Sequence, residues 1–264
     1  MIRLSIQDRL LPGEDIAAKW EAAQRYGFDA IELQALPIEE AAGEAKAAGI
    51  PISAICAGYR GWLIDPDPQQ VNLARRDIKR LLEVGAAVGA GCIVIPIYGR
   101  TRNLPGNGTG RSPAGDEALF LEGMRELASH AERVAGTLHL EAINRYENDV
   151  CVRVADSIRL RDAIGSPAVR VMGDVFHMNI EEDDFAAAFE AAGERLGYVH
   201  LADSQRLEPG QGHLDFDSVF RGLARIAYDG YASMECGLSG PPDEVLPRAV
   251  EYVRARIADA RPAA

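Results

Sequence analysis

The chain has 264 residues, and its 40 Asp and Glu against 28 Lys and Arg give a formal net charge of −12. This acidic balance argues against a nucleic-acid partner, because binding to phosphates requires clustered Lys and Arg. A composition of 47% hydrophobic and 26% charged residues is typical of a globular protein and excludes a disordered chain.

The sequence carries no signal for export or for insertion into a membrane. Its first residues lack the apolar stretch of a signal peptide, and the longest apolar run, 93–97, is too short to span a bilayer. The four cysteines are far apart and form no CxxC pair, which favours reduced thiols over a disulfide framework. We therefore expect a cytoplasmic protein without a membrane partner.

Short apolar or β-branched runs alternate with longer amphipathic segments along the whole chain. Strands are predicted over 3–7, 30–33, 52–56, 92–97, 137–141, 169–174, 198–201 and 231–235, and helices over 15–26, 71–88, 116–134 and 217–226. Eight such units of about 33 residues predict parallel strands with crossover helices, closed as a single (β/α)8 TIM barrel over 1–264. A doubly wound open sheet is the alternative, but the GxGxxG turn typical of it is missing.

Two short motifs indicate helix starts. Proline and acidic residues at 241–244 favour the first turn of a helix, where N–H groups lack partners and the dipole is positive. The acidic run 181–184 after Asn179 is interpreted in the same way, as a capped and solvated first turn.

The segment 98–115 is too long and too rich in glycine and proline for a simple connection. It follows the fourth strand, so in a barrel it lies at the active face, and loops of this length are commonly functional. We expect it to act as a lid or as a specificity element. Arg100, Arg102 and Arg111 in this loop are candidates to hold a phosphate or acid group on a substrate, or are simply solvated.

Four consecutive strands end in an ionisable residue. Glu141, Asp174, His200 and Glu235 follow one another at intervals close to the length of one unit. Because barrel enzymes place reacting groups at the carboxyl ends of their strands, these side chains are expected to converge. Three carboxylates and one imidazole suit a divalent metal ion, with Mn²⁺ expected first and Mg²⁺, Co²⁺ or Zn²⁺ as alternatives.

Three of these strand ends are followed by further polar residues on the same face of the predicted barrel. Glu147 follows Glu141 by six residues, His177 follows Asp174 by three, and Arg206 follows His200 by six. These three side chains are candidates for contact with a substrate.

The C-terminal half contains the segments LEAINRYEND, GDVFHMNIEE, HLADSQRLEPGQGHLDF and SMEC. Together they resemble the sugar isomerase/epimerase branch of the xylose isomerase-like barrels, and most of all the D-tagatose 3-epimerase and D-allulose (psicose) 3-epimerase group. The likeness is detailed over residues 138–236, whereas the N-terminal half shares only the strand–helix rhythm.

The resemblance implies roles for individual residues. It implies that Glu141, Asp174, His200 and Glu235 hold the metal, and that Glu141 and Glu235 also form the catalytic acid–base pair. It further implies that Glu147, His177 and Arg206 bind the oxygens of a ketose, which would be epimerised at C3 through a cis-enediolate. A homo-oligomer, either a dimer or a tetramer, is also expected from the resemblance.

The sequence departs from the pattern of this family near the expected substrate pocket. Ala142 replaces a proline that often follows the first glutamate, and the end of the first strand, 5–8, lacks aromatic residues that line the pocket in the family. Gln34, Tyr59 and Trp62 are therefore expected to shape a different pocket.

Three other classes of function are weighed against these residues. A 1,2-aldose/ketose isomerase or a hydroxypyruvate-type isomerase uses the same metal and the same enediolate. The endonuclease branch of these barrels needs more histidine ligands than the five His present, and a basic face. A non-catalytic sugar-binding protein has no need of a full set of acid–base and metal residues.

Overall fold

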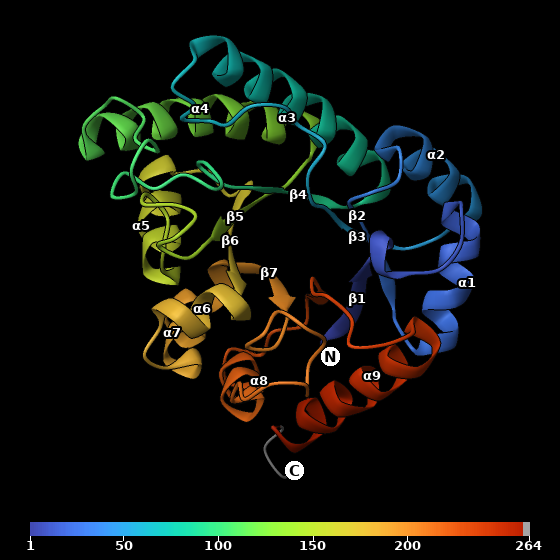
Figure 1. Cartoon of the computed structure of the whole chain (residues 1–264). Helices are drawn as coiled ribbons and strands as arrows, with labels where there is room; N and C mark the ends of the chain where they lie inside the picture. Colours follow the sequence, from blue (N-terminus) through green and yellow to red (C-terminus); the bar gives the residue numbers. More distant parts are fainter. Residues whose placement is uncertain (261–264) are drawn as a thin grey trace.

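The computed structural model describes residues 1–260, in which eight parallel strands close into a barrel in chain order (Figure 1). The strands are β1 (Arg3–Gln7), β2 (Ala30–Leu33), β3 (Ile52–Ile55), β4 (Gly91–Val94), β5 (Leu138–Ala142), β6 (Val169–Asp174), β7 (Leu196–Leu201) and β8 (Tyr231–Met234). The first and last strands pair with Ser5 opposite Ser233, which closes the cylinder. The predicted TIM barrel is confirmed, and the open sheet is excluded.

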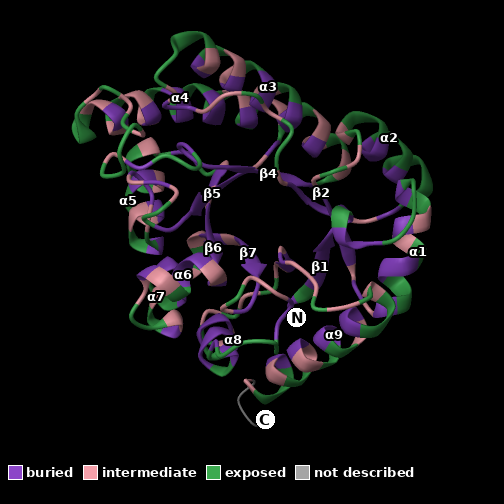
Figure 2. Cartoon of the chain, in the orientation of Figure 1, coloured by how far each residue is buried: buried purple, intermediate pink, exposed green. Residues whose placement is uncertain are grey.

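The helices form a ring outside the strands (Figure 1). Across residues 1–260 they are α1 (Ile16–Tyr26), α2 (Ile38–Ala48), α3 (Pro68–Val88), α4 (Pro113–Val134), α5 (Val154–Ile164), α6 (Val175–Glu181), α7 (Phe185–Ala192), α8 (Phe216–Arg225) and α9 (Pro242–Asp259). The strands are buried, and the outer sides of the helices are exposed (Figure 2). No helix among these residues has the length and apolar content to cross a membrane.

The prediction for the fourth strand extends three residues too far, whereas those for the third and eighth strands extend one residue too far. The run 92–97 was expected to be extended throughout, but β4 ends at Val94. Pro96 has no N–H group for the sheet, so pairing stops, while Ile95 and Ile97 stay buried. An apolar run therefore marks a buried segment here rather than the full extent of a strand.

The acidic run 181–184 is only partly a solvated helix start. Asp184 caps α7 by accepting the backbone N–H groups of Ala186 and Ala187, as expected for a first turn. Glu181, however, is the last residue of α6, and its buried carboxylate forms a 2.7 Å ion pair with Arg145. The expectation of a solvated turn is therefore wrong for Glu181.

Two of the three arginines of the long loop are held by contacts within the protein, whereas Arg100 is exposed, in agreement with the solvated alternative. Arg102 and Arg111 both pair with Asp116, a fully buried carboxylate in the first turn of α4. Arg111 also donates to the carbonyl oxygen of Asp65, in the segment before α3. These contacts fix the loop to the outside of the barrel, so we assign these two arginines to its packing.

We expect Asp116→Asn to destabilise the fold by about 3 kcal/mol, because it leaves two partly buried guanidinium groups without their shared anion. The free energy of unfolding from urea titration measures this loss. Glu122→Gln is the matched control, because Glu122 is an exposed partner of Arg75 and an exposed pair contributes less than about 1 kcal/mol. An equal loss in both variants would contradict the anchoring role of Asp116.

Candidate functional site

The four strand-end residues meet inside the mouth of the barrel. Glu141 lies in β5, Asp174 ends β6, His200 lies in β7 and Glu235 directly follows β8. Each offers one ligand atom, and these four atoms all lie within 4.8 Å of one another. The structure therefore brings together the cluster that the sequence predicts.

The geometry of this cluster suits a cation. Nδ1 of His200 lies 3.3 Å from an oxygen of Glu235, 3.6 Å from Glu141 and 3.8 Å from Asp174. Among the described residues, His200 Nδ1 and Asp174 Oδ2 are buried atoms without a hydrogen-bond partner. Buried polar atoms of native proteins are normally paired, so two unpaired ligand atoms facing one point fit a divalent metal ion.

Local structure directs these ligand atoms inward. The Oδ1 atom of Asp174 accepts N–H groups of Phe176 and His177 in the first turn of α6, which leaves Oδ2 to face the cluster. Glu235 accepts one hydrogen bond from Gln7 and another from Arg206, at 2.9 and 3.0 Å. These contacts fix the orientation of the Asp174 and Glu235 carboxylates.

Burial and mutual repulsion perturb the acids of the cluster. Burial, with the adjacent Glu235 carboxylate, raises the pKa of Asp174 to about 6, and burial also raises the pKa of Glu141. Burial alone would lower the pKa of His200, but the nearby carboxylates, Glu32 first, hold it well above its ordinary value. Without a cation, these carboxylates therefore compete for protons.

A cavity of about 360 Å³ opens above the cluster. Its polar end contains Glu141, His177, Arg206 and Glu235, and its remaining walls are largely aromatic and aliphatic. Gln34, Tyr59 and Trp62 line it, as expected, and Tyr98 is the residue that the long loop contributes. The ring of Trp62 lies between Tyr59 and Tyr98, with centroids 5.9 and 6.2 Å away.

Two of the three expected substrate-binding residues face this cavity. Nδ1 of His177 accepts the backbone N–H of Asn144, and burial lowers the pKa of His177 to about 4, so its ring is neutral. Arg206 stacks on the ring of Phe176, with its guanidinium carbon 4.7 Å from the ring centroid. Glu147 does not line the cavity, although its backbone oxygen accepts a hydrogen bond from Arg100 in the long loop.

Two residues next to the cluster, Glu32 and Cys56, were not predicted from the sequence. Glu32 of β2 is fully buried and accepts hydrogen bonds from Tyr198 and Gln7, at 2.7 and 2.8 Å. Cys56 lines the cavity with its Sγ 3.7 Å from Glu235. A carboxylate in the middle of the apolar strand 30–33 was the one available signal. All four cysteines are free, as the reduced state predicts.

The chain resembles known epimerases over most of its length. Residues 20–256 match the family described as xylose isomerase-like TIM barrel. A 3-dehydro-D-guloside 4-epimerase of Escherichia coli is 34% identical over 89% of this chain and 92% of its own. A D-psicose 3-epimerase of Ruminiclostridium cellulolyticum is 31% identical over 82% and 79% of the two chains.

A solved structure supports the same relationship. The crystal structure of a 3-keto-D-glucoside 4-epimerase from E. coli superposes with a TM-score of 0.91 at 31% identity, covering 97% of this chain and all of that one. The match extends over the whole barrel, including the N-terminal half that showed only a general rhythm in sequence. The chain therefore belongs to the xylose isomerase-like TIM barrel family, and it is an enzyme of the isomerase/epimerase class.

Proposed function

We propose that this enzyme is a metal-dependent epimerase that inverts a carbon next to the ketone of a keto-sugar. The observation that carries the proposal is the cluster of Glu141, Asp174, His200 and Glu235, with its two unpaired ligand atoms, at the base of a cavity. A divalent ion held by these four residues would polarise the ketone and lower the cost of removing the neighbouring proton.

Glu141 and Glu235 serve as the acid–base pair in this proposal. One carboxylate removes the proton from the carbon next to the ketone, which leaves an enediolate, and the other returns a proton to the opposite side of that carbon. Both carboxylates line the cavity, and Glu235 is held by Gln7 and Arg206 in a defined orientation. Inversion then requires no covalent intermediate with the protein.

His177 and Arg206 hold the oxygens of the substrate in this proposal. His177 is neutral, accepts a hydrogen bond at Nδ1 and therefore carries its proton on Nε2, which lies 3.9 Å from Asp174 at the cavity wall. Arg206 brings a fixed positive charge to the same wall. Donors held in place stabilise negative charge as it develops on oxygen, without reorganisation of water.

The carbon that inverts distinguishes two versions of this reaction. In a ketose the ketone is C2 and C3 inverts, whereas in a 3-keto-glycoside the ketone is C3 and C4 inverts. The same carboxylates serve both reactions, since each takes a proton from a carbon next to the ketone. The match to 92% of the length of the 4-epimerase favours C4 of a 3-keto-glycoside, and the relationship to the D-psicose 3-epimerase supports C3 of a ketose as the second candidate.

A panel of keto-sugars tests this assignment. We expect the purified enzyme with Mn²⁺ to convert a 3-keto-D-glucoside into its C4 epimer, and to act more slowly on D-psicose or D-tagatose, as followed by NMR of the products. Faster conversion of a free ketose at C3 would reverse the order of the two candidates. Formation of an aldose would instead indicate a 1,2-isomerase, and turnover of hydroxypyruvate a hydroxypyruvate-type isomerase.

Three further expectations from the sequence stay predictions. They are a role for Glu147 in binding the substrate, assembly into a dimer or tetramer, and location in the cytoplasm. Mn²⁺ stays the expected metal among the four candidates.

A further inference from the structure

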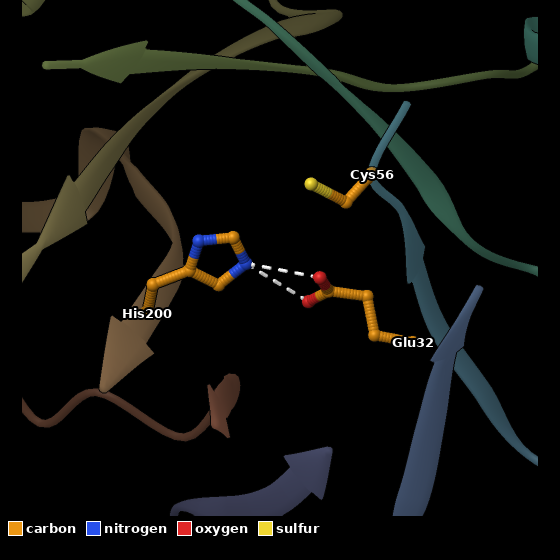
Figure 3. A group of neighbouring side chains, drawn as sticks. All are labelled: Glu32, Cys56 and His200. Atoms are coloured by element: carbon orange, nitrogen blue, oxygen red, sulfur yellow. Dashed lines mark hydrogen bonds and ion pairs between the residues drawn. The ribbon is translucent and has the colours of Figure 1, made fainter. Parts of the chain in front are cut away.

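Glu32 faces one ring nitrogen of His200, and the other three members of the cluster face the other nitrogen. Both side chains are fully buried, and Nε2 of His200 is 3.0 and 3.1 Å from the two carboxylate oxygens of Glu32 (Figure 3). The other ring nitrogen, Nδ1, points away from Glu32 and toward Glu141, Asp174 and Glu235. Nε2 of the imidazole is therefore hydrogen-bonded to Glu32, whereas Nδ1 has no hydrogen-bond partner and faces the other three residues of the cluster.

We infer that Glu32 is a positioning residue that keeps the proton of His200 on Nε2 and so presents the Nδ1 lone pair to the metal. A carboxylate with no proton can only accept, so the nitrogen facing it must donate. Metal binding requires the neutral imidazole, which has one N–H and one lone pair, so a proton fixed on Nε2 leaves the Nδ1 lone pair for the metal. The inference rests on the metal-dependent function proposed above.

Further hydrogen bonds hold Glu32 itself in place. Tyr198 donates to one oxygen and Gln7 to the other, and the Tyr198 hydroxyl is also 2.7 Å from the hydroxyl of Ser53. Gln7 donates to Glu235 as well, so one amide group connects Glu32 to a member of the cluster. Both oxygens of the buried Glu32 carboxylate therefore accept hydrogen bonds, as a buried carboxylate requires.

A second group of side chains near His200 could also hold a cation. Glu32, Cys56 and His200 also offer ligand atoms within 4.8 Å of one another (Figure 3). In that arrangement a cation would have to displace the hydrogen bonds that Glu32 already receives, whereas His200 Nδ1 and Asp174 Oδ2 have no partner to lose. The geometry therefore favours a cation on the Nδ1 side.

Replacement of Glu32 by glutamine tests the inference. The amide can donate to Nε2 of His200, which moves the imidazole proton to Nδ1, where it opposes metal binding. We expect the dissociation constant for Mn²⁺, measured by calorimetry, to rise 10- to 100-fold, the range seen when such an outer partner is removed. Glu32→Asp keeps a carboxylate and should recover part of the lost affinity.

Two control variants make the result specific. Asp77→Asn also converts a buried carboxylate to an amide, but Asp77 lies in α3 and pairs with Arg60, so Mn²⁺ affinity should not change. Cys56→Ser should likewise leave the affinity unchanged. A loss in Cys56→Ser as large as that in Glu32→Gln would overturn the inference, because the cation would then lie on the Glu32 side.

The wild-type enzyme provides a test that does not depend on how the variants fold. In the Zn²⁺-loaded protein, ¹⁵N NMR should find the proton of His200 on Nε2, and a proton on Nδ1 would overturn the inference. Wild-type affinity in Glu32→Gln would also overturn it while leaving the proposed function intact. A wild-type enzyme that binds no divalent ion would refute both.

Discussion

Glu141→Gln and Glu235→Gln are each expected to lower kcat by about 100-fold or more, the lower range for loss of a general acid or base. Glutamine keeps an oxygen for the metal but cannot accept a proton, so it separates proton transfer from metal binding. Alanine would remove both functions at once. Steady-state kinetics measures the loss, and metal content must be determined on the same samples.

The metal content of the two glutamine variants is the control for their loss of turnover. If both retain the metal and both lose turnover, each carboxylate is needed for a proton transfer. Gln7→Ala is a useful third variant, because Gln7 donates to Glu235 without entering the acid–base pair, and it should lower kcat less. Normal turnover in either metal-loaded glutamine variant would contradict the assignment of both glutamates.

Removal of the metal is expected to abolish turnover, and added Mn²⁺ or Co²⁺ to restore it. His200→Ala should weaken metal binding by more than about 100-fold, because it removes a ligand rather than a group that orients one. His177→Ala should have a smaller effect on metal binding, since Nδ1 of His177 is bonded to Asn144 and only its Nε2 approaches Asp174, at 3.9 Å.

Calorimetric titration of the two histidine variants measures this difference directly. Equal losses of affinity would show that His177 is also a ligand. Full turnover in a wild-type sample verified to be free of metal would contradict a metal-dependent reaction altogether.

The barrel could be predicted from sequence because its strands are short, apolar and regularly spaced. The ends of β1, β2 and β6 agree with the prediction, since each is bounded by polar or turn-forming residues. Pro96 was the available signal for the end of β4, but the apolar residues on either side of it outweighed that signal in the prediction. Ile95 and Ile97 are buried although they lie outside the strand, and a buried apolar residue looks the same in sequence whether or not it is extended.

The cluster could be predicted because its four members come from consecutive strands and share one end of the barrel. Glu32 was missed because it lies in β2, far in sequence from the four strands that carry the cluster. It contacts His200 of β7 only because the barrel closes. The pairing of Arg102 and Arg111 with Asp116 was missed for a similar reason. A charged loop residue reads as solvated until the buried partner is known.

Uptake of deuterium from solvent tests the central claim most directly. With the wild-type enzyme and a keto-sugar substrate in D₂O, the product should carry deuterium at the inverted carbon. One carboxylate removes the original proton, and the other, which has exchanged with solvent, donates a deuteron to the opposite side of that carbon. Label at C4 identifies a 3-keto-glycoside 4-epimerase, and label at C3 a ketose 3-epimerase. An inverted product that keeps its original hydrogen at that carbon would contradict inversion by two carboxylates.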